Sequence, residues 1–323
     1  MTDPEEWTFP QEMQPRAGEF HFDLEAAFDA VVLVRAEIPE DAFTAQILGT
    51  ERLGNGVVIG DGLVLTIGYL ITEATAIWLS TNRGSAVTGF PLAYDQASGF
   101  GLVQPLGRLD APALPRGSSA SCRVGDEVVV AGHGGAGHAL KARIFAKREF
   151  AGYWEYVLDE AIFTAPAHPN WGGAALIDDG GKLLGIGSLL VQEELGGKQV
   201  QGNMMVPIDL LEPILEDLLR LGRANRPPRP WLGIYATEAE GQLVVAGLAS
   251  GGPADQAGLR VGDVLLDVAG ARPQGLADLF RRVWSLGAAG AEVPFSVRRE
   301  GDTLRLAVRS ADRGDFLKKP HLH

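Results

Sequence analysis

Glycine-rich turns recur along the whole chain and separate short runs of β-branched residues. This spacing constrains the fold more than any other feature of the sequence. The 323 residues include 42 glycines and 19 prolines, spread through the chain and not gathered in one segment. Such a distribution favours many short strands joined by tight turns over a helical bundle. With 46% apolar and 21% charged residues, the composition is that of an ordinary globular protein, and we expect mainly β structure.

Two successive series of candidate strands follow. The first begins with the β-branched run at residues 30–38 and continues at residues 46–52, 56–59, 63–66, 76–80, 87–94 and 101–104. After a low-complexity connection at 106–120, the second covers residues 124–132, 139–146, 154–158, 161–165, 174–177, 183–191 and 200–206. Each series predicts a closed barrel of about six strands. A helix is expected at 210–221, with Pro207 before it and Gly222 after it.

The turn before the run GGAALIDDGGKLLGIGSL (172–189) carries the most specific motif of the second series. The run is similar to the end of the catalytic barrel in trypsin-like serine peptidases of the HtrA/DegP type, where a Gly-Asn-Ser-Gly-Gly-Pro-Leu turn holds the nucleophile. Here the turn reads Asn170-Trp171-Gly172-Gly173-Ala174. An indole has one N–H donor and no nucleophilic atom, so acyl transfer at Trp171 is excluded.

A second match lies beyond the Pro-rich stretch Arg223 to Pro230. The loop Trp231-Leu232-Gly233-Ile234, the segment 250–258 and the strand candidate 261–265 closely resemble a PDZ domain. The resemblance to the HtrA family covers roughly residues 28–311. It implies two six-stranded β-barrels of the chymotrypsin/trypsin type followed by one α+β PDZ domain. The domains would be an arm at 1–27, the double barrel at 28–222, a linker at 223–229, the PDZ domain at 230–311 and a tail at 312–323.

The resemblance also locates the other catalytic positions. The family histidine falls on Tyr69 and the orienting aspartate on Gly99. These positions are 30 residues apart, and Gly99 and Trp171 are 72 apart, both typical of the family. Tyrosine is a poor base at neutral pH. If no residue is deleted before Trp171, Pro169 falls on a position whose backbone N–H would form half of the oxyanion hole, and proline has no N–H. If one residue is deleted, the turn is shorter and the hole is misshapen.

These substitutions predict a catalytically inactive homologue that acts as a peptide-binding scaffold or chaperone-like adaptor in protein quality control. Two alternatives stay open. One is an active serine endopeptidase whose site is misaligned. The other is a regulator that tunes an active HtrA paralogue by mixed oligomerisation.

The resemblance assigns peptide binding to the PDZ groove. Backbone N–H groups at Trp231, Leu232, Gly233 and Ile234 would receive a terminal carboxylate, and the edge of the strand would pair with the peptide. Leu276 and Phe280, with Leu279 and Val283, would line the opposite wall. The alternative is that these helix residues are simple core residues. The expected partners are therefore protein or peptide C-termini.

Charge and composition limit the other partners. The net charge of −13 opposes binding to nucleic acid, and no apolar run is long enough to span a membrane. No cofactor is expected. Without a readable signal peptide the expectation is a cytoplasmic protein, or a periplasmic one by family analogy if a leader is missing. The lone Cys122 is expected to be small buried filler.

Several remaining residues have a weaker interpretation. His133 and His138 are five apart in a glycine-rich turn, but they have no ligand partner nearby, so solvent-facing histidines are expected and no metal site. His168 could fill the cleft by stacking or hydrogen bonding, while Asp95 and Ser188 are expected to be structural. Residues 1–25 should dock on a neighbouring chain or on the first barrel. By analogy, four aromatic residues would support a homotrimer: Trp7, Phe9, Phe20 and Phe22.

Overall fold

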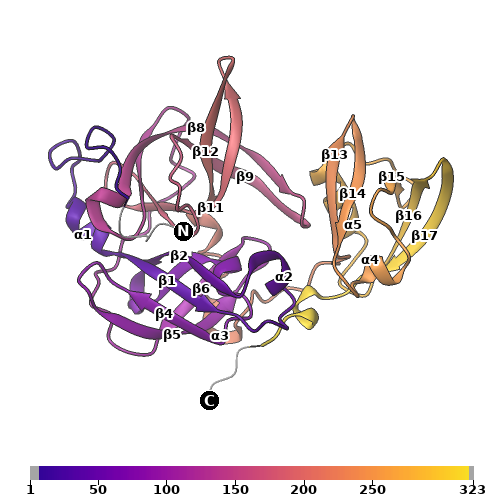
Figure 1. The fold of residues 1–323 in the computed structure, drawn as a ribbon, viewed down its shortest axis with the longest axis horizontal. Helices are drawn as coiled ribbons and strands as arrows, with labels where there is room; N and C mark the ends of the chain where they lie inside the picture. The colour runs from indigo at the N-terminus through magenta and orange to yellow at the C-terminus, as the bar shows by residue number, and fades with distance from the viewer. Residues whose placement is uncertain (1–6, 320–323) are drawn as a thin grey trace. The chain divides into compact units, whose positions relative to one another are not determined.

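The computed structural model describes residues 7–319, which form two compact units (Figure 1). Within the described residues, the barrel unit comprises 7–148, 160–225 and 318–319. The PDZ unit comprises 149–159 and 226–317. Residues 149–159, which the sequence places inside the second barrel, therefore cluster with the PDZ sheet, because their turn is hydrogen-bonded to it.

The first barrel is closed by six strands in the order β1-β2-β3-β6-β5-β4. All pairings along this order are antiparallel. The strands are β1 (Val31–Glu37), β2 (Glu51–Val58), β3 (Val64–Ile67), β4 (Ala76–Ser80), β5 (Ala86–Tyr94) and β6 (Phe100–Pro105). Buried apolar side chains such as Leu65, Leu79 and Leu102 fill its interior, which accounts for the β-branched and leucine-rich runs in the sequence.

The second barrel is also closed by six strands, in the order β10-β11-β12-β9-β8-β7. They are β7 (Glu127–Ala131), β8 (Ala139–Gly152), β9 (Tyr156–Ala165), β10 (Ala175–Ile177), β11 (Leu183–Leu195) and β12 (Lys198–Pro207). Its core includes Val128, Leu140, Ile162, Leu184 and Met205. The predicted pair of trypsin-like barrels is thus confirmed.

Several predicted boundaries were wrong. Residues 46–48 belong to the helix α2 (Ala45–Leu48), and β2 is one strand where two were expected. Similarly, β9 joins the two strands predicted at 154–158 and 161–165. The predicted helix at 210–221 is split into the 3-10 turn η4 (Ile208–Leu210) and α3 (Leu215–Leu221). Pro213 lies between the two, where its missing N–H interrupts the helical ladder.

Other short elements complete the barrel unit. They are α1 (Leu24–Asp29), η1 (Gly60–Gly62), η2 (Gly68–Leu70) and η3 (Gly135–His138). Gly222 ends α3 in the left-handed conformation with φ of 70°, as the expected C-cap. No helix among residues 7–319 is long and apolar enough to cross a membrane.

The N-terminal arm docks on the second barrel of its own chain, whereas we expected the first barrel or a neighbour. Phe9 is buried in the core of that barrel, and its N–H donates to the Gly137 carbonyl at 2.9 Å. The N–H of Lys141 donates to the Met13 carbonyl at 2.9 Å. Part of the aromatic surface of the arm is therefore buried within its own chain.

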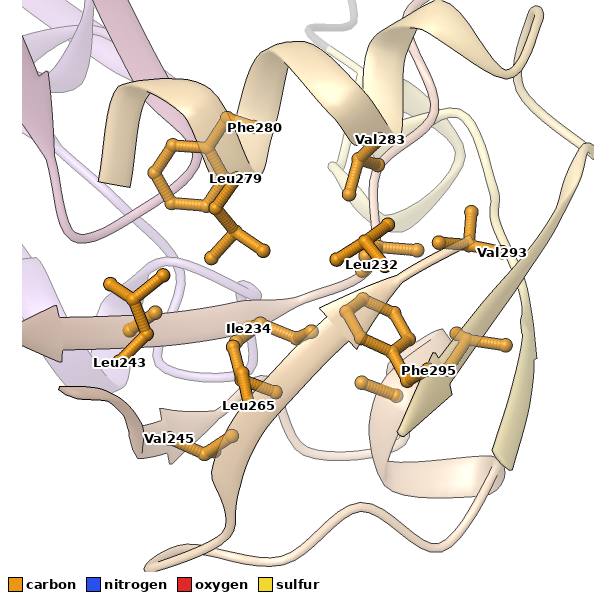
Figure 2. Packing of buried hydrophobic residues seen from close by; sticks show 14 of the residues in the cluster. Leu232, Ile234, Leu243, Val245, Leu265, Leu279, Phe280, Val283, Val293 and Phe295 are labelled. Atoms are coloured by element: carbon orange, nitrogen blue, oxygen red, sulfur yellow. The ribbon is translucent and has the colours of Figure 1, made fainter. Parts of the chain in front are cut away.

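The PDZ unit is a five-stranded sheet in the order β13-β14-β15-β16-β17, with all its neighbours antiparallel. Its elements are β13 (Ile234–Ala239), β14 (Gln242–Leu248), α4 (Pro253–Gln256), β15 (Val264–Val268), α5 (Leu276–Ser285), β16 (Glu292–Arg299), β17 (Asp302–Arg309) and the 3-10 turn η5 (Arg313–Phe316). Figure 2 shows Leu279, Phe280 and Val283 on the side of α5 that faces the strands. Since β13 has one neighbour in the sheet, its other edge is available for hydrogen bonding.

Candidate functional site

The three positions that the resemblance aligns with the catalytic triad converge in the barrel unit. Tyr69 lies in η2, directly after β3. The N–H of the preceding Gly68 donates to the Gly99 carbonyl at 2.7 Å. Gly68 has no room for a side chain, because an added Cβ would lie 2.2 Å from the Tyr94 ring. Close backbone packing therefore brings Gly99 beside the turn that carries Tyr69.

The Tyr69 phenol connects the two barrels. Its hydroxyl donates to the Ser188 carbonyl on β11 at 3.0 Å. Burial raises the pKa of the Tyr69 phenol well above its ordinary value, and the nearby Trp171 side chain offsets this only in part. The phenol stays neutral at any physiological pH, and it serves as a structural link.

The turn that carries Trp171 is held by Asn55 of β2. The Asn55 side-chain nitrogen donates to the Asn170 carbonyl at 2.8 Å and to the Gly172 carbonyl at 3.2 Å. The Asn55 backbone N–H also donates to the Gly172 carbonyl, at 2.7 Å. Gly173 adopts φ of 77°, and a Cβ there would lie 1.8 Å from the Asn55 carbonyl oxygen. The turn is rigidly attached to the first barrel.

Asp95 makes hydrogen bonds within its own loop. Its carboxylate accepts from the Ser98 N–H at 2.8 Å, and its carbonyl accepts from the Gly99 N–H at 2.8 Å. Gly99 adopts φ of 84°, a conformation that disfavours side chains with a Cβ. Asp95 thus closes the loop after β5, in agreement with the structural role expected for it.

His168 is fully buried beside the same turn. Its Nδ1 accepts from the Asn170 N–H at 3.1 Å, so its Nε2 carries the proton and donates to the His138 carbonyl at 2.9 Å. Its ring lies 5.8 Å from Trp7 and 5.2 Å from Phe9, measured between centroids. Burial lowers the pKa of His168 to about 4. The expected filling by stacking and hydrogen bonding is therefore present, and the imidazole is neutral.

His138 is not a solvent-facing histidine, contrary to the prediction. It lies in η3 and is 9% exposed, with its ring 4.7 Å from the Trp7 ring. Burial lowers its pKa. The prediction was wrong because the N-terminal arm covers this turn, a contact that residue spacing along the chain does not indicate. Within residues 7–319, no group of three or more His, Cys, Asp or Glu is placed to hold a metal ion; Cys122 is buried, as expected.

The second candidate site lies in the PDZ unit, at the loop entering β13. Three successive backbone N–H groups, those of Leu232, Gly233 and Ile234, donate to the carboxylate of Glu155. The distances are 3.1, 2.7 and 3.0 Å. Three converging donors of this kind form a site for an anionic oxygen. The loop therefore recognises a carboxylate, and in this structure the carboxylate comes from the chain itself.

The edge of β13 continues the same interaction. The N–H of Ala236 donates to the Tyr153 carbonyl at 3.0 Å. Glu155 is buried, and burial raises the pKa of its carboxyl to about 7, while the N–H groups of Ile234, Leu232 and Gly233 and the charge of Arg313 oppose the rise. The turn Tyr153 to Glu155 is thus bound along the strand edge.

The structure separates the predicted peptide-binding residues by role. Leu232, Gly233 and Ile234 supply the backbone donors. Trp231 is buried and packs 4.8 Å from the Phe316 ring. On α5, Phe280 is 2% exposed and belongs to the core cluster, while the half-buried Leu276 packs against it.

Sequence reasoning missed Glu155 and Tyr153. The only signal in the sequence was a single glutamate in the aromatic stretch Tyr153-Trp154-Glu155-Tyr156. Nothing in the residue pattern links that stretch to the loop at Leu232, because the contact joins positions 77 to 79 residues apart.

Comparisons with known proteins agree with this architecture. Residues 54–186 match the trypsin-like peptidase domain family, and residues 230–309 match the PDZ domain family. The serine endoprotease DegS of Haemophilus influenzae is 25% identical over 223 residues, which cover 68% of this chain and 65% of the relative. A probable periplasmic serine endoprotease, DegP-like, of Pseudomonas fluorescens is 28% identical over 265 residues, covering 78% of this chain and 54% of the relative.

Solved structures share the fold. An HtrA-type protease, AlgW with tripeptide, superposes with a TM-score of 0.51 at 20% identity and covers 93% of this chain and 99% of that chain. The serine endoprotease from Yersinia pestis gives a TM-score of 0.50 at 22% identity, covering 90% and 98%. The chain spans roughly one half to two thirds of the curated relatives cited above.

The fold and the two sites define a class of protein: a double-barrel trypsin-like peptidase domain followed by a PDZ domain. Within that class, the order of the two domains and the DegS and DegP-like relatives make the chain similar to proteins of the HtrA type.

Proposed function

We propose that this chain is a catalytically inactive HtrA-like protein that acts as a peptide-binding scaffold or chaperone-like adaptor through its PDZ groove. One observation carries the first half of the proposal. The positions aligned with the family histidine and serine carry a phenol that burial keeps neutral and an indole. Neither group can serve as nucleophile or as general base near pH 7. Loss of a triad alone costs roughly six orders of magnitude in kcat in a serine peptidase.

The relatives are named serine endoproteases, so activity is the alternative that must be tested. A fluorophosphonate probe and an unfolded protein substrate are each incubated with homogeneous protein. We expect no serine adduct in the mass spectrum and no hydrolysis. A stoichiometric adduct on one serine, together with hydrolysis that a serine-to-alanine change abolishes, would establish an active endopeptidase and overturn the proposal.

The second half of the proposal rests on the loop entering β13. Its three N–H donors already bind a carboxylate, and the outer edge of β13, on which the turn Tyr153 to Glu155 lies in this structure, suits pairing with an extended peptide. Leu276 on α5 would contact the ligand side chain. The test is a peptide panel with free C-terminal carboxylates and the same panel amidated. Binding that is indifferent to amidation would argue against carboxylate capture.

The regulator hypothesis differs in what it predicts for assembly. A regulator of an active paralogue would co-purify with an intact HtrA-type peptidase, whereas a scaffold would give a homomeric mass in native mass spectrometry. The aromatic residues that support a trimer by analogy are partly engaged within the chain, since Phe9 is in the core of the second barrel. Phe20 and Phe22, 5.6 Å apart between ring centroids, are the better candidates for such an interface.

A further inference from the structure

We infer that Glu155 is a built-in occupant of the PDZ carboxylate site, so that a peptide with a free C-terminus binds only after the turn around Glu155 has left the groove. The inference rests on the peptide-binding function proposed above and names the regulation of that same site. It concerns residues 149–159, which belong to the PDZ unit.

The hydrogen-bond donors leave no place for two carboxylates. The Oε1 atom of Glu155 accepts from Gly233 at 2.7 Å, from Ile234 at 3.0 Å and from Leu232 at 3.2 Å. Each N–H has one hydrogen. Those of Gly233 and Ile234 are directed at Oε1, and that of Leu232 is shared between Oε1 and Oε2, at 3.2 and 3.1 Å. A peptide carboxylate that uses the same donors must therefore displace the glutamate.

The backbone of the turn occupies the strand edge as well. The Ala236 N–H donates to the Tyr153 carbonyl, and two residues earlier the Ile234 N–H donates to the Glu155 side chain. The turn thus uses one backbone donor of the strand edge and places a carboxylate at the loop, as a peptide added to the edge of β13 would. The turn therefore blocks the carboxylate site and the adjoining strand edge together.

Apolar contacts with the core cluster and ion pairs with α5 also hold the turn. Val157 is 8% exposed and belongs to the cluster that contains Ile234 and Phe280. Arg281 of α5 pairs with Glu149 at 2.5 Å and with Asp159 at 2.6 Å. Since both β13 and α5 contribute, the turn is held between the two elements expected to line the groove.

The conformation of Glu155 is also unfavourable for an ordinary turn residue. Its φ is 61°, a left-handed conformation in which glycine is the default and a glutamate is strained. Its carboxyl group is buried as well, which disfavours the charged form. A glycine would satisfy the turn better, so the glutamate is accounted for by what its carboxylate binds.

The test compares wild type with Glu155→Gly and Glu155→Gln in the full chain. Glycine keeps the left-handed turn and removes the carboxylate, so that folding is preserved. Fluorescence anisotropy measures binding of labelled hexapeptides with free C-termini ending in each apolar residue. Because affinity is reduced by the fraction of competent molecules, we expect Glu155→Gly to bind at least about tenfold more tightly than wild type. Glu155→Gln keeps a neutral side chain with the same acceptor oxygen, so it should stay docked and bind no more tightly than wild type. Glu194→Gln, on an exposed position of β11, is the charge-matched control and should bind like wild type.

A second measurement does not depend on any peptide. In ¹H–¹⁵N spectra without ligand, Glu155→Gly should shift the amide signals of Leu232, Gly233 and Ile234, and Glu194→Gln should leave them unchanged. Unshifted amides in Glu155→Gly, or equal peptide affinity in wild type and Glu155→Gly, would overturn the inference and leave peptide binding intact. Failure of every variant to bind any free C-terminus would instead overturn the proposed function, while shifted amides would still support the occupancy by Glu155.

Discussion

At the scale of single residues, the buried imidazole of His168 makes the stability of the barrel unit depend on pH in the acid range. Its pKa is lowered by burial to about 4 from an ordinary value of 6.5. Protonation places a hydrogen on Nδ1, which breaks the bond from the Asn170 N–H. As the pH falls, the unfolded chain binds this proton at a higher pH than the folded chain. The contribution of neutral His168 to the free energy of unfolding is therefore fully present above pH 6.5 and is lost as the pH falls toward 4, by about 3 kcal/mol.

The corresponding experiment measures the free energy of urea unfolding between pH 7 and about pH 4. His168→Gln keeps a side-chain N–H for the His138 carbonyl and does not titrate, so its stability should fall less steeply over this range. His21→Gln, at an exposed histidine, is the control and should retain the wild-type slope. Parallel curves for His168→Gln and wild type would contradict the assignment of a neutral buried imidazole.

Tyr69 offers a second residue-scale prediction. Tyr69→Phe removes the hydroxyl that donates to the Ser188 carbonyl at 3.0 Å and leaves that carbonyl without this donor. A hydrogen bond of this kind contributes about 1 kcal/mol to the free energy of unfolding. We expect a loss of that size in chemical denaturation, with unchanged peptide binding by the PDZ unit. A variant as stable as wild type would show that the phenol is only a space filler.

At the scale of elements, docking of the turn between β8 and β9 on the loop entering β13 depends on pH. This dependence can be measured separately from the titration of the peptide ligand. The pKa of Glu155 is raised to about 7 in the docked turn, from an ordinary value of 4.5. Because the docked state holds the proton more tightly, docking is most favourable below pH 4.5 and weakens as the pH rises through 7.

The ratio of peptide dissociation constants, wild type over Glu155→Gly, isolates this competition because the titration of the peptide itself cancels. We expect the ratio to decrease as the pH is raised from about 5 to about 8. Arg313, whose charge lowers the pKa of Glu155, is kept in both proteins. A ratio that rises with pH would mean that the carboxylate is bound in its charged form over the whole range.

The ion pairs of α5 should matter much less than the buried carboxylate. The side chains of Arg281, Glu149 and Asp159 are 44%, 45% and 92% exposed, and exposed pairs contribute about 0–1 kcal/mol. At about 0.5 kcal/mol for each of its two pairs, Arg281→Gln should therefore improve peptide affinity by only about fivefold. A gain as large as that of Glu155→Gly in the same anisotropy assay would show that α5, and not the loop entering β13, holds the turn.

The sequence predicted the elements whose signal is local. Strand runs bounded by glycine turns located both barrels, and the loop Trp231 to Ile234 located the PDZ domain. The helix at 210–221 was overextended because apolar spacing outweighed the break at Pro213. The strands β8 and β9 were predicted too short, since part of their length lies in the PDZ unit, where partners distant in sequence decide the structure.

At the scale of the whole molecule, the positions aligned with the triad come from both barrels, and the sequence could identify them only through spacing along the chain. It could not show that the Tyr69 hydroxyl donates to the Ser188 carbonyl of the other barrel, or that the N-terminal arm buries His138 and His168. Those contacts depend on how the barrels and the arm pack. The same holds for Glu155, whose role is set by the hydrogen bonds of a loop far along the chain.

Restoring the family residues tests whether several positions in the barrel unit, and not one alone, account for the absence of peptidase activity. In the combined variant Tyr69→His, Gly99→Asp and Trp171→Ser, we expect no detectable hydrolysis of an unfolded protein. Gly99 has φ of 84°, so an aspartate there is strained, and Pro169, at the position that the resemblance aligns with an oxyanion donor, has no N–H. Adding Pro169→Gly supplies an N–H at that position and should bring hydrolysis into the detectable range, because one such donor changes kcat by about two orders of magnitude. Robust hydrolysis by Trp171→Ser alone would show that Tyr69, Gly99 and Pro169 do not limit catalysis.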